Sequence, residues 1–245
     1  MHVQIFLDEI EMGKAAGSLA ATSIKDAIAK NGRANIILAT GTSQFEVLKN
    51  LVADTTIDWS KVTMFHLDEY IGLDINSPAG FGNYLRERFV SKVPSLKNAF
   101  IIDGNDDPEE ECNQMNKLIE KHPIDVALIG IGENGHLAFN DPPADFQTFT
   151  PFIIVELDEK CRQQQLGEGW FPNLDAVPRT AITMSIQQIL KSKKIICSVP
   201  GKRKAEVVKS CAEIPISNLV PATILREHAD CHLFLDADSA ALLAK

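Results

Sequence analysis

The chain is best understood from one segment, Gly130-Ile131-Gly132-Glu133-Asn134-Gly135-His136-Leu137-Ala138-Phe139-Asn140-Asp141-Pro142. It follows Val126-Ala127-Leu128-Ile129, an apolar run that is typical of a fully buried strand. The glycines allow a sharp turn at the carboxyl end of this strand, where open α/β sheets bind their ligands. We therefore expect a functional site here; the alternative is a capped turn whose polar side chains only satisfy backbone groups.

Apolar runs and helical patterns alternate on both sides of this segment. The pattern predicts an α/β fold, in which a mostly parallel, Rossmann-like open sheet carries helices on both faces. The predicted strands are residues 4–6, 34–38, 62–67, 99–102, 126–129, 152–157, 195–199 and 231–235. The predicted helices are residues 12–31, 45–51, 84–93, 108–120, 203–211 and 221–228, and residues 142–149 and 162–178 are expected to be loops or a lid.

The composition limits the classes of function. At 245 residues the chain is predicted to form a single domain, residues 1–245. Its net charge of −9 argues against nucleic acid as a partner, because binding to a phosphate backbone needs a positive surface. No apolar run is long enough for a membrane span, and the N-terminus lacks a signal-peptide pattern, so we expect a cytoplasmic protein. The five scattered cysteines are expected to be reduced structural thiols.

Two predicted strands end in residues that can bind an anion or accept a proton. Thr40-Gly41-Thr42-Ser43 places hydroxyls and backbone N–H groups at the start of a helix, which favours anion binding through Gly41, Thr42 and Ser43. Asp68 and Glu69 follow the strand 62–67 and point to opposite sides of an extended backbone. We expect Asp68 to face the cleft as a general base, and Glu69 to orient a partner or to bind backbone donors.

A third strand end carries His136 together with Asn134 and Asp141. Histidine exchanges protons near neutral pH, and a nearby carboxylate can fix its tautomer and raise its basicity. Asp68, His136 and Asp141 could also suggest a metal site, but no histidine pair or ligand cluster has the spacing typical of one, so we do not expect a metal.

A basic run, Lys202-Arg203-Lys204, follows the strand 195–199 and begins a helix. Cations at this position oppose the helix dipole, which suggests that an anion binds there; a solvated helix start is the alternative. Together, the residues offer an anion site, a base and a histidine. That set suits a small phosphorylated molecule that undergoes ring opening or proton abstraction next to a carbonyl group.

Two motifs resemble the glucosamine-6-phosphate deaminase (isomerase) family, whose superfamily includes the 6-phosphogluconolactonases. They are Phe65-His66-Leu67-Asp68-Glu69-Tyr70-Ile71-Gly72-Leu73 and the segment from Gly132 to Pro142. Tyr70 and Ala138-Phe139-Asn140 favour the deaminase branch over the lactonases. The resemblance implies a hydrolase of carbohydrate metabolism that converts glucosamine 6-phosphate, or galactosamine 6-phosphate, to a ketose 6-phosphate and ammonia.

The resemblance also implies roles for particular residues. His136 assists opening of the sugar ring, and Asp68 moves a proton from C2 to C1. Asp141 and Asn134 lie in the catalytic motif beside His136. The phosphate is held by Gly41, Thr42, Ser43 and Lys204, and Glu69, Gly135 and Arg162 are further candidates for substrate binding. The resemblance implies that the reaction needs no metal and no organic cofactor. The implied partner is a small phosphorylated sugar, and the family makes a homo-oligomer plausible.

This chain departs from the family pattern at three places. Asn134 stands where the deaminases have aspartate, and Asp141 stands where they have glutamate. A phosphate-binding arginine of the family has no counterpart in Arg162-Gln163-Gln164-Gln165-Leu166-Gly167-Glu168-Gly169-Trp170-Phe171, so Arg162 or Lys202 is expected to replace it.

These departures leave two alternatives open. One is a 6-phosphogluconolactonase-like hydrolase, in which His136 activates water. The other is a sugar-phosphate-binding protein that has lost catalysis. Residues 144–145 and 151–154 also lack the serines and basic residues that allosteric members of the family carry, so we expect no activation by an acetylated amino sugar phosphate.

Overall fold

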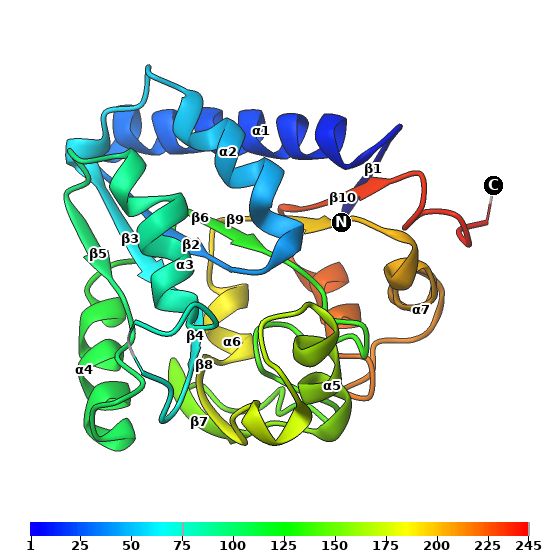
Figure 1. Cartoon of the computed structure of the whole chain (residues 1–245). Helices are drawn as coiled ribbons and strands as arrows, with labels where there is room; N and C mark the ends of the chain where they lie inside the picture. Colours follow the sequence, from blue (N-terminus) through cyan, green and yellow to red (C-terminus); the bar gives the residue numbers. More distant parts are fainter. Residues whose placement is uncertain (75, 245) are drawn as a thin grey trace.

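The centre of the molecule is a parallel sheet of seven strands in the order β1–β10–β9–β6–β2–β3–β5. The computed structural model describes residues 1–74 and 76–244 (Figure 1). Because the strands are parallel, their carboxyl ends meet at one edge of the sheet, which is where the predicted site residues lie. The strands are β1 (His2–Phe6), β2 (Ala34–Leu38), β3 (Val62–His66), β5 (Asn98–Phe100), β6 (Val126–Ile129), β9 (Lys194–Val199) and β10 (Cys231–Asp236).

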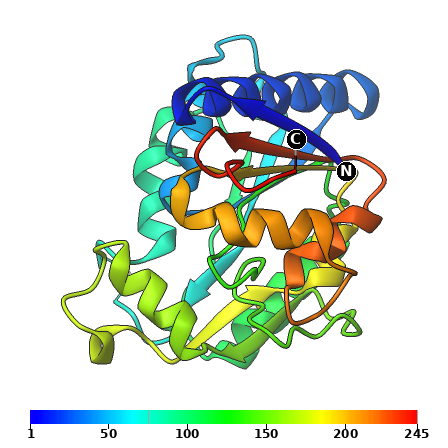
Figure 2. The ribbon, with the colours of Figure 1, turned by 90° about the vertical axis from the view of Figure 1, so that its right-hand side faces the viewer.

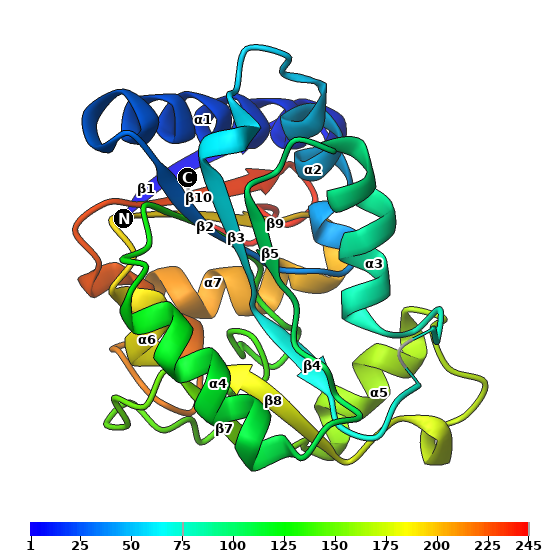
Figure 3. The ribbon, with the colours of Figure 1, turned by 90° about the vertical axis from the view of Figure 1, so that its left-hand side faces the viewer.

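Helices cover both faces of this sheet. Helices α1 (Glu9–Asn31), α2 (Phe45–Ala53) and α3 (Phe81–Arg88) pack on one face. Helices α4 (Pro108–Glu120), α6 (Ile186–Leu190) and α7 (Ala205–Glu213) pack on the other. Figure 2 shows α1 and α7 on opposite sides of the sheet, and Figure 3 shows α4 on the same side as α7.

The strands at the centre of the sheet are mostly apolar because they contribute to two cores. In β2, Ile36 and Leu38 belong to the core beneath α1 and α2, whereas Ile37 belongs to the core beneath α4 and α7. All five residues of β2 are buried, as expected for a strand that is covered on both faces. The predicted fold class, an open and mostly parallel α/β sheet between two layers of helices, is confirmed.

A second sheet, which the sequence did not reveal, extends the site edge of the first. It consists of the antiparallel strands β4 (Asp68–Tyr70), β8 (Thr180–Met184) and β7 (Phe152–Glu156). The predicted strand 62–67 therefore ends one residue earlier, and the chain passes from the first sheet to the second at Leu67, whose carbonyl accepts the Met184 N–H at 3.0 Å. This crossing places Asp68 at the junction of the two sheets.

Other predicted elements need correction. The expected loop 162–178 contains most of a helix, α5 (Glu159–Gly167), and a 3-10 turn, η4 (Leu174–Ala176). Residues 221–228 form a 3-10 helix, η6 (Pro221–Glu227), rather than an α-helix. The predicted helix 84–93 is α3 followed by η3 (Val90–Lys92), and η2 (Trp59–Lys61) precedes β3.

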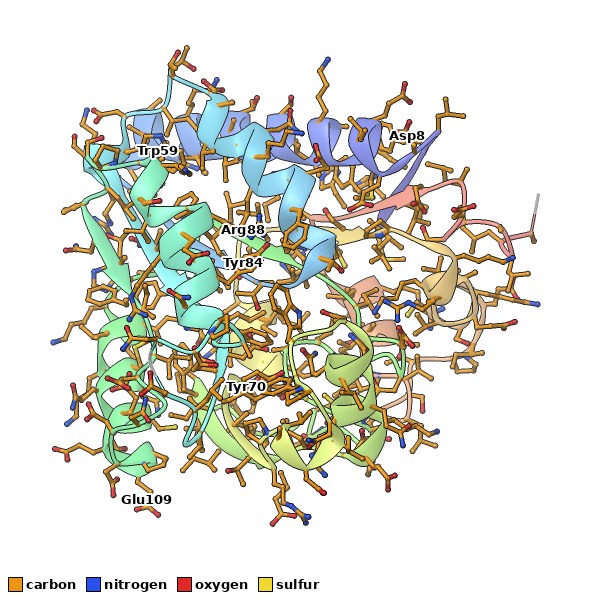
Figure 4. The ribbon with its side chains drawn as sticks, viewed as in Figure 1. Asp8, Trp59, Tyr70, Tyr84, Arg88 and Glu109 are labelled. Atoms are coloured by element: carbon orange, nitrogen blue, oxygen red, sulfur yellow. The ribbon has the colours of Figure 1, made fainter. Side chains whose placement is uncertain are left out.

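Helix α3 is fixed against α2 by aromatic and cationic contacts. The Arg88 guanidinium lies 4.0 Å from the centre of the Phe45 ring, and that ring stacks on Tyr84. Figure 4 shows Arg88 and Tyr84 next to each other. Tyr84 then donates its hydroxyl hydrogen to the Gly41 carbonyl at 3.0 Å. Helix α3 therefore supports the loop that follows β2. None of the helices formed by residues 1–74 and 76–244 combines the length and the apolar character that crossing a membrane requires.

Candidate functional site

A cleft of about 310 Å³ lies at the carboxyl ends of β2, β6 and β9 and contains most of the predicted site residues. The cleft is lined by the three loops that follow these strands and by residues of α5 and of the turn after α5. The lining residues from the loops are Thr40, Gly41, Thr42, Ser43, Gly130, Ile131, Gly132, Pro200, Gly201, Lys202, Arg203 and Lys204. Asp68, His136, Gln164 and Glu168 also line the cleft.

His136 faces this cleft with one ring nitrogen, while the other is occupied by a carboxylate. Its Nδ1 lies 2.9 Å from Oδ1 of Asp141, and both side chains are largely buried. The imidazole lies directly over Gly132, where a Cβ atom would be only 2.2 Å from Nε2. Gly132 is therefore required for the close approach of the ring, and Nε2 is the nitrogen that can exchange protons with a ligand.

Asp141 is held by two further parts of the chain. Asn134 donates from Nδ2 to its Oδ1 at 3.1 Å, and the backbone N–H of Asp158 donates to its Oδ2 at 3.0 Å. Burial alone would raise the pKa of Asp141, but the contacts with His136, Asn134 and Asp158 outweigh it and lower the pKa. Asp141 is thus an anionic partner for His136 although it is one methylene shorter than the family's glutamate. Asn134 connects the two residues, because its Oδ1 also accepts the backbone N–H of His136 at 3.1 Å.

Asp68 and Glu69 are adjacent but have different surroundings. Asp68 is 5% exposed and lines the cleft. Burial, together with the neighbouring Glu69 carboxylate, raises the pKa of Asp68 to about 8. Glu69 points away from the cleft and accepts the backbone N–H groups of Tyr70, Phe81 and Gly82. A carboxyl group whose pKa lies near neutrality can both accept and return a proton.

Two loops with the same backbone conformation, residues 41–44 and 201–204, line the part of the cleft that is called the anion end below. Gly41 after β2 has φ 89°, and Gly201 after β9 has φ 92°, a region that favours glycine. In each loop a 3-10 turn, η1 (Thr42–Gln44) or η5 (Lys202–Lys204), leads directly into a helix. Burial lowers the pKa of Lys204, while the nearby Glu133 and Glu168 carboxylates act in the opposite direction. Backbone donors, hydroxyl groups and a partly buried ammonium group thus converge at this end, as an anion site requires.

The structure does not bring three of the predicted substrate-binding residues to the cleft. Arg162 lies on α5, but its guanidinium donates to the carbonyls of Leu174 and Val177 and so ties the following segment to the helix. Gly135 forms the turn before His136 and accepts the Ala222 N–H at 2.8 Å. Glu69, as described above, fixes the start of α3.

Three residues of α5 and the turn after it line the cleft and were not predicted from the sequence: Gln164, Gln165 and Glu168. Gln164 accepts the Glu133 N–H at 2.8 Å and thereby joins α5 to the histidine loop. Glu168 lines the anion end and belongs to residues 162–171, the segment that lacks a counterpart of the family's arginine. The sequence indicates these residues only weakly, because helix α5 is polar and the glycines on both sides of Glu168 are typical of a loop.

Among residues 1–74 and 76–244, two groups of side chains have donor sets that could hold a metal ion. The ligand atoms of His136, Asp141 and Cys161 lie within 4.8 Å of one another, as do those of His2, Asp230 and His232. In the second group the carboxylate already contacts an ammonium group, since Lys194 Nζ lies 2.6 Å from Oδ2 of Asp230. In the first group the carboxylate is engaged by His136, Asn134 and Asp158.

Comparison with known proteins agrees with this geometry. Residues 7–233 match the family described as glucosamine-6-phosphate isomerases/6-phosphogluconolactonase. A glucosamine-6-phosphate deaminase of Lacticaseibacillus paracasei is 36% identical over the full length of both chains. One of Streptococcus pneumoniae is 34% identical and covers 97% of this chain and 98% of its own.

Solved structures give the same result. A monomeric glucosamine-6-phosphate deaminase superposes with a TM-score of 0.89 at 33% identity, covering 99% of this chain and 100% of its own. A 6-phosphogluconolactonase from Shewanella baltica superposes with a TM-score of 0.79 at 18% identity, over 97% of this chain and 98% of its own, and so shares the fold. The chain therefore belongs to the family of glucosamine-6-phosphate isomerases and 6-phosphogluconolactonases.

Proposed function

We propose that this protein is an amino-sugar phosphate deaminase that converts glucosamine 6-phosphate, or its galactosamine isomer, and water to a ketose 6-phosphate and ammonia. The observation that carries the proposal is that one cleft is lined by Asp68 and His136 together with the Gly41 and Gly201 loops. The sequence similarity to deaminases over the full chain supports the same reaction.

The phosphate binds at the anion end, where Thr42, Ser43 and Lys204 supply donors. This contact orients the sugar so that its reacting carbons lie near Asp68 and His136. His136 then exchanges protons with the ring and anomeric oxygens through Nε2, which opens the ring. The Asp141 carboxylate on Nδ1 stabilises the protonated imidazole that forms during this transfer.

Ionised Asp68 removes the proton from C2 of the open chain, and the C1 carbonyl oxygen takes a proton, which gives an enolamine. Asp68 returns its proton to C1, so that the nitrogen becomes an imine at C2. Addition of water to C2 and departure of ammonia give the ketose phosphate. A pKa of about 8 for Asp68 suits a group that must both accept and return the same proton.

The first test is release of ammonia from purified protein that is given glucosamine 6-phosphate or, separately, galactosamine 6-phosphate. Release from one sugar would support the reaction and identify the substrate. Failure with both sugars, combined with hydrolysis of 6-phosphogluconolactone, would replace the proposal with lactonase activity. Binding of the sugars without turnover of any substrate would favour a protein that has lost catalysis.

We further propose that the partner is a small phosphorylated sugar, that neither nucleic acid nor a membrane is bound, and that the protein acts in the cytoplasm. The five cysteines are all unpaired and buried, which is compatible with a reducing compartment. A homo-oligomer stays a prediction from the family resemblance; the structural relative named above is described as monomeric.

A further inference from the structure

A carboxylate stands at the anion end of the cleft, close to the groups assigned to the phosphate. Glu168 follows the last residue of α5 and lines the same cleft as Thr42 and Lys204. A Cβ atom built on Gly41 would lie 3.8 Å from Oε2 of Glu168, which places this oxygen over the loop after β2. Glu168 also acts on Lys204 across the cleft, since its charge opposes the lowering of the lysine pKa by burial.

Neutral donors hold both oxygens of this carboxylate. Gln164 donates from Nε2 to Oε1 at 3.0 Å, and Trp170 donates from Nε1 to Oε2 at 3.3 Å. Both donors belong to α5 or to the turn that follows it, so the carboxylate is fixed by its own segment. Within residues 1–74 and 76–244, no lysine or arginine forms an ion pair with Glu168. Its negative charge is therefore held in the cleft without a paired cation.

Glu168 adds a negative charge to a part of the cleft that otherwise attracts anions. Lys202 and Lys204 attract a phosphate from the β9 side together with Arg203, whose guanidinium also lies 3.4 Å from the Glu133 carboxylate, while Glu168 repels it from the α5 side. Charges several ångströms apart in a partly buried cleft interact much more strongly than in bulk water. A residue that repels the wrong ligand contributes to specificity as much as one that attracts the right ligand.

We propose that Glu168 is a specificity-determining residue that weakens binding of simple anions and of the ketose phosphate product relative to the amino sugar phosphate. The inference rests on the proposed function. An amino sugar phosphate carries an ammonium group, so its net charge is about one unit less negative than that of the ketose phosphate. The repulsion from Glu168 is thus smallest for the substrate and larger for the deaminated product and for inorganic phosphate.

The test compares Glu168→Gln with the unchanged protein and with Glu159→Gln, a matched control on the exposed first turn of the same helix. Binding of inorganic phosphate and of the ketose 6-phosphate is measured by calorimetry at low ionic strength, and KM is measured for the amino sugar phosphate. We expect Glu168→Gln to bind inorganic phosphate about tenfold more tightly, with a smaller decrease in KM. The gain should shrink in high salt, and Glu159→Gln should behave like the unchanged protein.

The outcomes separate this inference from the proposed function. Equal or weaker phosphate affinity in Glu168→Gln, or no measurable phosphate binding in any of the three proteins, would overturn it. A tenfold gain in a protein that releases no ammonia would support the role of Glu168 and count against the deaminase reaction alone. If Glu168→Gln does not fold, Glu168→Ala removes the same charge and must show the same gain.

Discussion

The two ends of the cleft are built in different ways. The proton-transfer end consists of buried side chains that hold one another, such as Asp68 and the His136–Asp141 pair. The anion end consists of two glycine turns, and the side chains that it adds are half-buried or exposed. The comparison teaches that chemistry depends on side chains in fixed positions, whereas binding of the phosphate depends first on backbone shape.

Within the anion end, the two loops repeat one backbone and differ in charge. In the first, Gln44 donates its N–H to the Gly41 carbonyl at 3.1 Å; in the second, Lys204 donates to the Gly201 carbonyl at 3.0 Å. The first loop carries hydroxyl groups, and the second carries three cations. The two loops follow β2 and β9, which lie on either side of β6, and the loop after β6 bears His136. A ligand in the cleft therefore lies between the neutral loop after β2 and the cationic loop after β9.

The largest effect is expected at the proton-transfer end. Asp68→Asn removes the base, so kcat should fall by about 10² to 10⁴-fold while the affinity for inorganic phosphate is unchanged. Exchange of the C2 hydrogen with solvent deuterium, followed by NMR, measures the step directly. Asp58→Asn, an exposed aspartate, serves as the control. Persistent exchange in Asp68→Asn would show that another group is the base.

The next effect concerns the cationic loop. Lys204→Ala should raise KM by about 10 to 100-fold and change kcat little, because a charged hydrogen bond to the phosphate is lost. Steady-state kinetics with Lys209→Ala, an exposed lysine on the following helix α7, provides the matched comparison. A loss confined to kcat would contradict a role of Lys204 in phosphate binding and indicate a role in proton transfer.

A change of pH should act on the proton-transfer end alone. Asp68 must be ionised to accept a proton, and its pKa is raised to about 8. Its ionised fraction therefore increases from about one tenth at pH 7 to about nine tenths at pH 9, so kcat/KM should increase by up to about tenfold over this range. A pH profile of kcat/KM measures this, and a flat profile between these values would contradict the role of Asp68 as the base.

The neutral loop should give a smaller effect than the cationic one. Thr42→Ala removes a hydroxyl donor and leaves the backbone N–H groups in place, so KM should rise only about 2 to 10-fold. The increase should also depend less on salt than that of Lys204→Ala, since no charge is removed. An equally large and equally salt-dependent effect of both variants would remove the distinction between the two loops.

The last prediction is that an acetylated amino sugar phosphate does not activate this protein. Residues 144–145 and 151–154 lack the serines and basic residues associated with allosteric members, so an acetylated amino sugar phosphate should not shift the half-saturation point. Saturation curves with and without this compound test the expectation, and a shift of several-fold would refute it.

The parallel sheet could be predicted because its strands are continuous apolar runs, and the strand ends then located Asp68, His136 and the Gly41 loop. The antiparallel sheet could not, since Thr180–Met184 is neither a continuous apolar run nor a regular alternation of polar and apolar residues. Helix α5 was missed for a related reason: only Cys161, Arg162 and Gln165 are buried in it, and these residues do not form an apolar stripe. The position of Glu168 depends on that helix and was invisible for the same reason.

Helix α5 also has a consequence for the dynamics of the protein. The Asp158 N–H before its first turn holds Asp141, and the residue after its last turn is Glu168. Local opening of this one polar helix would therefore release both ends of the cleft in a single event. Amide hydrogen exchange along residues 159–167 thus reports the fraction of molecules in which the whole site is assembled. A bound substrate that contacts both ends should slow exchange along the helix as one unit.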